Sequence, residues 1–95
     1  MRPDIFIVLV MRIQITYKTD SLDALAAIDG EIENCVAQHG ATKEGSGYGP
    51  EGRELVFNVF PNTELKRIKR ALGHVAPHMK YRGLVTNMTL EVLSE

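Results

Sequence analysis

The chain opens on a long apolar run, IFIVLVMRIQITY, at residues 5–17. Every odd position in this run is apolar, whereas the even positions change from apolar to polar at Arg12. Alternation with a period of two is typical of a β-strand. The run therefore predicts one long first strand whose first half is apolar on both faces and whose second half is apolar on one face.

Apolar residues then recur every three or four positions, which predicts a first helix over about 21–39. Asp20 or Ser21 is the expected N-cap, and Gly40 is a natural stop. Gly30 inside this helix should cost about 1 kcal/mol relative to alanine, and close approach to a second helix is one reason for it. The stripe of this helix consists of Leu25, Ile28, Ile32, Cys35 and His39.

The middle of the chain is dense in glycine. GATKEGSGYGPEGRE, at residues 40–54, predicts a short second strand followed by a wide loop. LVFNVF, at residues 55–60, alternates and predicts a third strand. Phe57 shares the core face of that strand with Leu55 and Val59.

The last third of the chain predicts a second helix and a fourth strand. Asn62 or Thr63 is the expected helix cap, and Pro77 should end the helix near Val75 because proline lacks the backbone N–H. GLVTNMTLEVL, at residues 83–93, alternates again and predicts the fourth strand.

The resulting order, β-α-β-β-α-β, covers the whole chain and resembles the ferredoxin-like split βαβ superfold. The resemblance implies an α+β sandwich in which a four-stranded sheet carries two helices on one face. The 95 residues fit a single domain, 1–95, with residues 1–10 as an extension of the first strand. Superfolds host many functions, so the resemblance implies no particular activity.

Two helices can cover only one face of such a sheet, so the other face is left for solvent or a partner. The residues expected there are part polar and part apolar, and exposed apolar patches usually mark interaction sites. A contact that buries about 600 Å² of apolar area contributes on the order of 15 kcal/mol before entropy costs. We therefore expect a homodimer. The expected interface residues are Val8, Val10, Arg12, Val56, Phe60, Val85 and Leu93.

The N-terminal run has alternatives as an export signal or a membrane anchor, and its pattern argues against both. Its unbroken apolar part, residues 5–11, is at the short limit for a signal peptide, and no cleavage site follows. Arg12 and Gln14 interrupt it before the roughly 20 apolar residues that a membrane span needs. A single cysteine fits a reducing compartment. We expect a cytoplasmic protein, with Met11 as an alternative start that would leave the first ten residues as an extension.

Composition argues against nucleic acid as a partner. The net charge is −1, whereas affinity for nucleic acid comes largely from neutralising phosphates. RELVFNVF, at residues 53–60, stands where an RNA-recognition motif has its third-strand signature, but Glu54 and Leu55 replace the expected glycine and aromatic residue.

Two patterns suggest ligand chemistry weakly. GYGPEG, at residues 47–52, matches a dinucleotide-binding glycine motif but precedes a strand instead of opening a helix, so a hairpin loop is the better interpretation. Such a loop can still line a pocket in which Lys43, Tyr48 or Arg53 meets an anion.

Histidine and cysteine spacing is the second pattern. His74 and His78 are four residues apart, as are Cys35 and His39, but Pro77 should break the turn between the two histidines. Metal sites usually need three or four ligands, and no third ligand is evident. We assign no metal, no cofactor and no catalytic residue, and we keep His74 and His78 as weak ligand-binding candidates.

The two helices are oppositely charged. The first carries acidic residues and no lysine or arginine from residue 19 to 42. The basic stretch of the second consists of Lys66, Arg67, Lys69 and Arg70. Solvated faces that complement each other are one interpretation, at about 0–1 kcal/mol per exposed pair. A polarised surface that steers a charged partner is the other.

These observations favour a non-catalytic protein-binding module, homodimeric and of the accessory or inhibitory type, such as a toxin-neutralising protein. This is a fold-level analogy. The alternative is a small-molecule-binding protein, or one like the small dimeric oxygenases, with a pocket at the sheet face or dimer interface. Candidate residues for that alternative are Tyr17, His74, His78 and Asn87.

Overall fold

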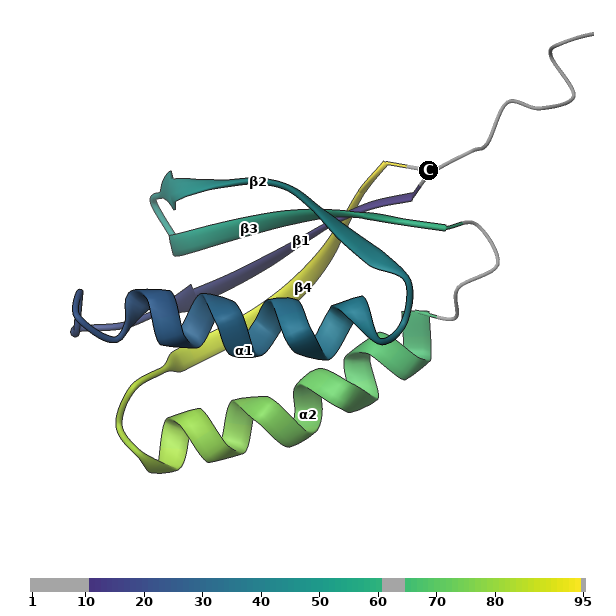
Figure 1. The fold of residues 1–95 in the computed structure, drawn as a ribbon. Helices are drawn as coiled ribbons and strands as arrows, with labels where there is room; N and C mark the ends of the chain where they lie inside the picture. Colours follow the sequence, from purple (N-terminus) through teal and green to yellow (C-terminus); the bar gives the residue numbers. More distant parts are fainter. Residues whose placement is uncertain (1–10, 61–64, 95) are drawn as a thin grey trace, which may run out of the picture.

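The computed structural model describes residues 11–60 and 65–94 of the chain. The fold is α+β, with a four-stranded antiparallel sheet and two helices, and it is compatible with a ferredoxin-like fold (Figure 1). The elements follow one another as β1 (Met11–Lys18), α1 (Leu25–Ala37), β2 (Ala41–Gly49), β3 (Gly52–Val59), α2 (Leu65–Tyr81) and β4 (Thr86–Ser94). The first half of the predicted first strand, the predicted interface residues Val8 and Val10, and the predicted cap of the second helix lie outside the described residues.

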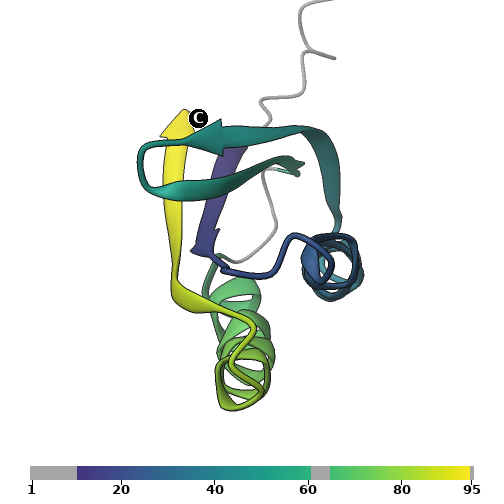
Figure 2. The same ribbon diagram turned by 90° about the vertical axis from the view of Figure 1, so that its left-hand side faces the viewer.

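The sheet has the strand order β2-β3-β1-β4, and every neighbouring pair is antiparallel. In this register Ile15 lies opposite Leu55 on one side and opposite Leu90 on the other. Both helices lie on the same side of the strongly twisted sheet (Figure 2). The central strands β1 and β3 therefore have one face turned toward the helices and one face that no helix covers.

The core lies between the sheet and the helices, and the alternating pattern explains its membership. Side chains two residues apart point to the same face of a strand, and every third or fourth residue lines one side of a helix. Burying one large aliphatic or aromatic side chain contributes about 1.5–3 kcal/mol. The most deeply buried residues are Ile13, Ile15 and Tyr17 of β1, Leu55, Phe57 and Val59 of β3, Ile28, Ile32 and Val36 of α1, and Ile68 of α2.

The first helix is shorter than predicted at both ends. A turn precedes it, in which the Ser21 hydroxyl accepts a hydrogen bond from the backbone N–H of Ala24 at 3.2 Å. Ser21 therefore caps this turn, and regular helix begins at Leu25. Gly40, with φ 81°, turns the chain toward β2, as expected of a helix stop. A Cβ added at Gly30 would meet nothing within 4 Å, so close approach of α2 does not explain this glycine.

The second helix does not end at Pro77, so that prediction was wrong. It continues to Tyr81, and Met79, beyond the proline, is buried in the core. The actual stop is Gly83, at φ 71°, whose N–H bonds to the carbonyl of Lys80 while the N–H of Leu84 bonds to the carbonyl of Met79. This pair of bonds is a Schellman ending. The stabilisation gained by burying Met79 offsets the loss of the hydrogen bond that the proline cannot donate.

The glycine-rich stretch forms a nine-residue strand, β2, instead of a short strand and a wide loop. It pairs with β3 up to Gly49 opposite Gly52, so only Pro50 and Glu51 separate the two strands. Pairing with β3 satisfies the backbone groups along one edge of a segment whose glycines favour strands little by themselves. Gly52 has φ 125°, and an added Cβ would collide with the carbonyl oxygen of Tyr17.

Val85 lies in the core, with 2% of its surface exposed, and not on the uncovered face where alternation places it. The pairing of β1 with β4 shifts between Thr16 and Lys18, and Asn87 adopts a positive φ of 52° there. This irregularity adds one residue to β4, as a β-bulge does. The added residue reverses the alternation, so Val85 joins the helix-facing side.

Within the described residues, neither helix is both long enough and apolar enough to cross a membrane.

Candidate functional site

The uncovered face of the sheet differs between its two ends. One end, where β1 begins and both β3 and β4 finish, carries Phe60 and Leu93 on the uncovered face. Val92 is exposed at the same end, but it lies opposite the core residue Ile13 and so on the helix-facing side. Phe60 is 54% exposed, Val92 38% and Leu93 39%. We call these three residues the apolar sheet end. The pairings Met11 with Val59 and Arg12 with Ser94 hold the three strand ends together here.

Apart from Val56, the rest of the uncovered face that the structure describes is polar or glycine. A hollow of about 500 Å³ opens on it, and the Gln14 amide donates a hydrogen bond to the Thr16 hydroxyl at 3.3 Å. Thr16 is buried although no helix covers it. The lining residues of the hollow are Gln14, Thr16, Lys18, Glu51, Asn87, Met88, Thr89 and Glu91. This half of the face offers hydrogen-bonding groups, whereas the apolar sheet end offers hydrophobic area.

The predicted interface residues differ in how exposed they are and in whether they already have a partner within the chain. Phe60 and Leu93 are exposed at the apolar sheet end, and Val56 is half-buried on the same face. The Arg12 guanidinium already has a partner, since its Nε and Nη2 donate to the two carboxylate oxygens of Glu44 at 2.9 and 3.0 Å. Val92 was not predicted, because alternation assigns it to the helix-facing side. It stays exposed because it lies near the end of β4.

The five weak ligand-binding candidates do not converge on one site. Lys43 pairs with Glu33 of α1 at 3.2 Å. Arg53 pairs with Asp29 of α1, and its guanidinium carbon lies 5.3 Å from the ring centre of Tyr48. His74 and His78 are exposed on α2. Helix α2 continues through Pro77, so the two histidines are one helical turn apart, contrary to the predicted break.

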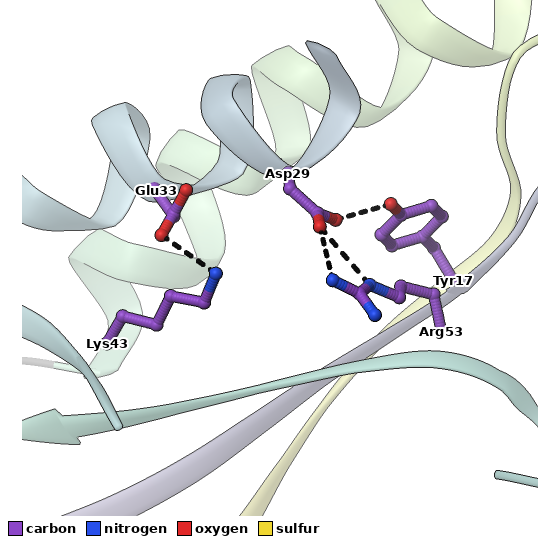
Figure 3. Close-up of polar contacts among 5 residues, drawn as sticks. All are labelled: Tyr17, Asp29, Glu33, Lys43 and Arg53. Atoms are coloured by element: carbon purple, nitrogen blue, oxygen red, sulfur yellow. Dashed lines mark hydrogen bonds and ion pairs between the residues drawn. The ribbon is translucent and has the colours of Figure 1, made fainter. Parts of the chain in front are cut away.

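Asp29 is the centre of a buried polar cluster between α1 and the sheet (Figure 3). Its Oδ1 accepts the Tyr17 hydroxyl at 2.5 Å. Its Oδ2 accepts Nη2 and Nε of Arg53 at 2.7 and 3.2 Å. A hydrogen-bonded charge pair with this geometry holds the helix to β1 and β3. Sequence reasoning missed Asp29, although its position four residues after Leu25 and next to Ile28 puts an acid within the apolar stripe.

The charges and pKa shifts in this cluster favour a structural role over a role in proton transfer. Burial, followed by the hydrogen bond to Asp29, raises the pKa of Tyr17 well above its ordinary value. The hydrogen bond to Asp29 also raises the pKa of Arg53. A general acid or base works best with a pKa near the operating pH. Tyr17 therefore stays protonated, and Arg53 stays charged, at any pH near neutrality.

Cys35 is half-buried beside the core. Burial, with a smaller contribution from the Glu31 carboxylate, raises the pKa of its thiol. A raised pKa lowers the population of the nucleophilic thiolate. Across residues 11–60 and 65–94, no three His, Cys, Asp or Glu side chains are grouped so that they could hold a metal ion.

The basic stretch of α2 divides between two sides of the helix. Lys69 lines an apolar cavity of about 240 Å³ between α2 and β4, together with Leu72 and Met88. Arg67 and Arg70 line a separate groove toward the end of α1. All four residues of the predicted charged surface are exposed on α2.

Comparison with models of known protein families gives no match, and comparison with curated proteins gives none either.

Proposed function

We propose that this protein is a non-catalytic protein-binding module that acts as a homodimer, of the accessory or inhibitory type to which toxin-neutralising proteins belong. The observation that carries the proposal is the apolar sheet end, where Phe60 and Leu93 are exposed on the uncovered face and Val92 is exposed on the other face of the same end. The strand order β2-β3-β1-β4 supports assignment to the ferredoxin-like superfold. The single cysteine supports a reducing compartment such as the cytoplasm.

The amino-acid sequence next to the apolar sheet end strengthens the argument. Isolated exposed apolar residues are ordinary, whereas a contiguous patch usually marks an interaction surface. Residues 5–10, IFIVLV, directly precede β1 and contain no polar side chain. In the proposed dimer, the apolar sheet end excludes water. About 600 Å² of apolar area would contribute on the order of 15 kcal/mol before entropy costs.

The described cations also support binding over catalysis. Arg12, Lys43 and Arg53 each pair with a carboxylate of the same chain. Side chains held in this way organise the fold. The raised pKa values of Tyr17 and Cys35 make neither group a ready base or nucleophile near neutral pH.

The direct test is the mass of the full-length protein in solution. Light scattering coupled to size-exclusion chromatography should give a dimer. The double variant Phe60→Glu, Leu93→Glu should shift it to a monomer, because the new carboxylates cannot be desolvated without a partner. Leu22→Glu is the matched control, since Leu22 is 75% exposed and precedes α1, far along the chain from the apolar sheet end.

A monomeric wild-type protein at every concentration would contradict the proposal. Equal dissociation by Leu22→Glu and by the double variant would show that the apolar sheet end is not the contact. Circular dichroism of each variant separates loss of assembly from loss of folding.

A second candidate, small-molecule binding on the uncovered face, is supported by the polar hollow. Its volume of about 500 Å³ is within the range of ligand pockets. A ligand there should raise the melting temperature of wild-type protein and raise it less in Gln14→Ala, because Gln14 lines the hollow. A compound that stabilises both proteins equally binds elsewhere.

A further inference from the structure

A groove of about 300 Å³ lies between the end of α1 and one side of α2. Its lining residues are His39, Arg67, Arg70, Ala71 and His74. We propose that this groove binds a small phosphomonoester, with Arg70 as the principal ligand and the imidazoles of His39 and His74 beside it. The groove lies in the helix layer and not on the uncovered sheet face, so this proposal does not depend on the proposed dimer.

Two features of the sequence form the α2 wall of the groove: the spacing of its residues and the small side chain of Ala71. Arg67, Arg70, Ala71 and His74 are spaced three and four residues apart, so they form one stripe along α2. This stripe is next to the core-facing stripe that contains Ile68 and Leu72. Ala71 has only a methyl group, which leaves space between the longer side chains on either side.

The opposite wall comes from the turn that follows α1. The N–H of His39 bonds to the carbonyl of Val36 at 2.9 Å, and the N–H of Gly40 bonds to that of Ala37 at 3.1 Å. Gly40 then adopts φ 81°, a conformation that favours glycine. The turn holds His39, which is half-buried, at the groove rather than in the apolar stripe of α1 where its spacing placed it.

Charge identifies the kind of ligand. Arg70 brings a guanidinium to the groove, His39 and His74 bring imidazoles, and no lining residue is acidic. Arginine remains protonated at every physiological pH. Asp29 and Glu33 of α1 are engaged with the sheet, by Arg53 and Lys43 (Figure 3). An anion in the groove would therefore meet several donors and no carboxylate from the lining.

Geometry favours a phosphomonoester over a carboxylate. A terminal phosphate has three acceptor oxygens, and guanidinium groups bind phosphate through paired N–H donors. Donors from two elements approach it from different directions, whereas a flat carboxylate would satisfy fewer of them. The volume of about 300 Å³ is at the lower end for small-molecule pockets. A net charge of −1 argues against an extended nucleic acid.

The test is a titration of the full-length protein with inorganic phosphate and with glycerol phosphate, followed by two-dimensional NMR. Backbone signals of His39, Arg70 and His74 should move together and saturate. Arg70→Gln should weaken the affinity about tenfold or more, the effect of losing a charge-assisted pair. Arg82→Gln is the matched control, because Arg82 is exposed just after α2 and does not line the groove.

Three results would overturn the proposal. Signals that stay in place with both probes would show that the groove does not take phosphate. Equal weakening by Arg70→Gln and Arg82→Gln would indicate only general attraction between charges. Tighter binding of a short oligonucleotide, with the same signals moving, would identify a nucleic-acid surface instead. The oligomeric mass, measured on the same samples, is expected to be unchanged, so failure of the dimer proposal would be recognised separately.

Discussion

At the scale of single residues, Asp29 has the most consequential environment in the described part of the chain. It receives a neutral hydroxyl from Tyr17 and a charged guanidinium from Arg53, so its carboxylate is compensated although it is buried. Removing one member of a buried pair is costly because the other charge stays behind. The exposed fractions of the two charged side chains are 14% for Arg53 and 10% for Asp29. Water therefore has little access to solvate a charge that has lost its partner.

Asp29→Asn should lower the free energy of unfolding by about 2–4 kcal/mol, since Arg53 keeps its charge without a counter-ion. Glu33→Gln is the control on the same helix. Its pair with Lys43 is about one-third exposed and should contribute only about 0–1 kcal/mol. Urea denaturation of both variants measures the difference. Losses of equal size would mean that the Asp29 cluster is no more important to stability than an ordinary surface pair.

Tyr17 should give the protein a specific sensitivity to alkali. The fold raises the pKa of Tyr17, so folding favours the protonated phenol. In the unfolded chain the phenol ionises near its ordinary pKa of about 10. The stabilising contribution of Tyr17 is therefore complete below about pH 10 and is lost as the pH rises from there toward the higher pKa of the folded state.

The measurement compares wild-type protein with Tyr17→Phe. The wild-type protein should be more stable by about 1–2 kcal/mol at neutral pH, because of the hydrogen bond to Asp29. The difference in the free energy of unfolding between the two proteins should decrease above pH 10, by up to about 1.4 kcal/mol per pH unit. A gap that stays constant through this range would show that Tyr17 ionises equally in both states.

At the scale of elements, α2 shows which residue controls the length of a helix. Pro77 is a strong stop signal locally, but the helix continues because Met79 is buried in the core beyond it. Gly83 ends the helix through backbone geometry that most other residues adopt only with strain. The length of α2 thus reflects packing at its far end more than the local preference of one residue.

Pro77→Ala should raise the free energy of unfolding by about 1–2 kcal/mol. Alanine restores a backbone N–H that can bond four residues back and is about 3 kcal/mol more favourable inside a helix. Part of this gain is offset because proline also restricts the unfolded chain. Urea denaturation and far-ultraviolet circular dichroism give the test. A destabilised variant with less helix would mean that the proline ring itself packs favourably.

Strand β2 shows that a pairing partner can decide the conformation of a segment whose local preference is weak. Its glycines give no strong local preference for a strand, and they were expected to form mostly loop. The register with β3, from Ala41 opposite Val59 to Gly49 opposite Gly52, supplies partners along the whole segment. Strand preference is largely a property of the neighbours, so a segment with weak preference follows a well-patterned partner such as β3.

At the scale of the whole molecule, one side of the sheet is covered by helices and the other is divided into a polar half and the apolar sheet end. A protein that assembles through such an end gains stability by mass action. The melting temperature of the wild-type protein should therefore rise with protein concentration, because unfolding of a dimer releases two chains.

The double variant Phe60→Glu, Leu93→Glu should have a melting temperature that does not depend on concentration. Differential scanning fluorimetry over a hundredfold range of concentration, on the order of micromolar to hundreds of micromolar, spans typical weak dimers. Concentration-independent melting of the wild-type protein would argue against assembly. If the melting temperature of Leu22→Glu also became independent of concentration, the dimer contact would not be specific to the apolar sheet end.

The candidate site was predictable only in part. Alternation along the third and fourth predicted strands assigned Phe60 and Leu93 to the uncovered face, and both are exposed. It misplaced Val85, because a bulge near Asn87 reverses the faces of β4, and it missed Val92. The groove at His39 and Arg70 was not predicted, since these two residues on opposite walls are 31 positions apart in the chain.

The sequence by itself determined the order of the elements, the inward faces of β1 and β3, and the apolar stripe of α1. These follow from the direction of successive side chains along a regular backbone, which is a local property. Only the tertiary structure decided where α2 ends, that β2 pairs along its full length, which side Val85 takes and what surrounds Asp29. Each of those outcomes depends on residues distant in the chain, whose contact energies outweigh a local preference of about 1–3 kcal/mol.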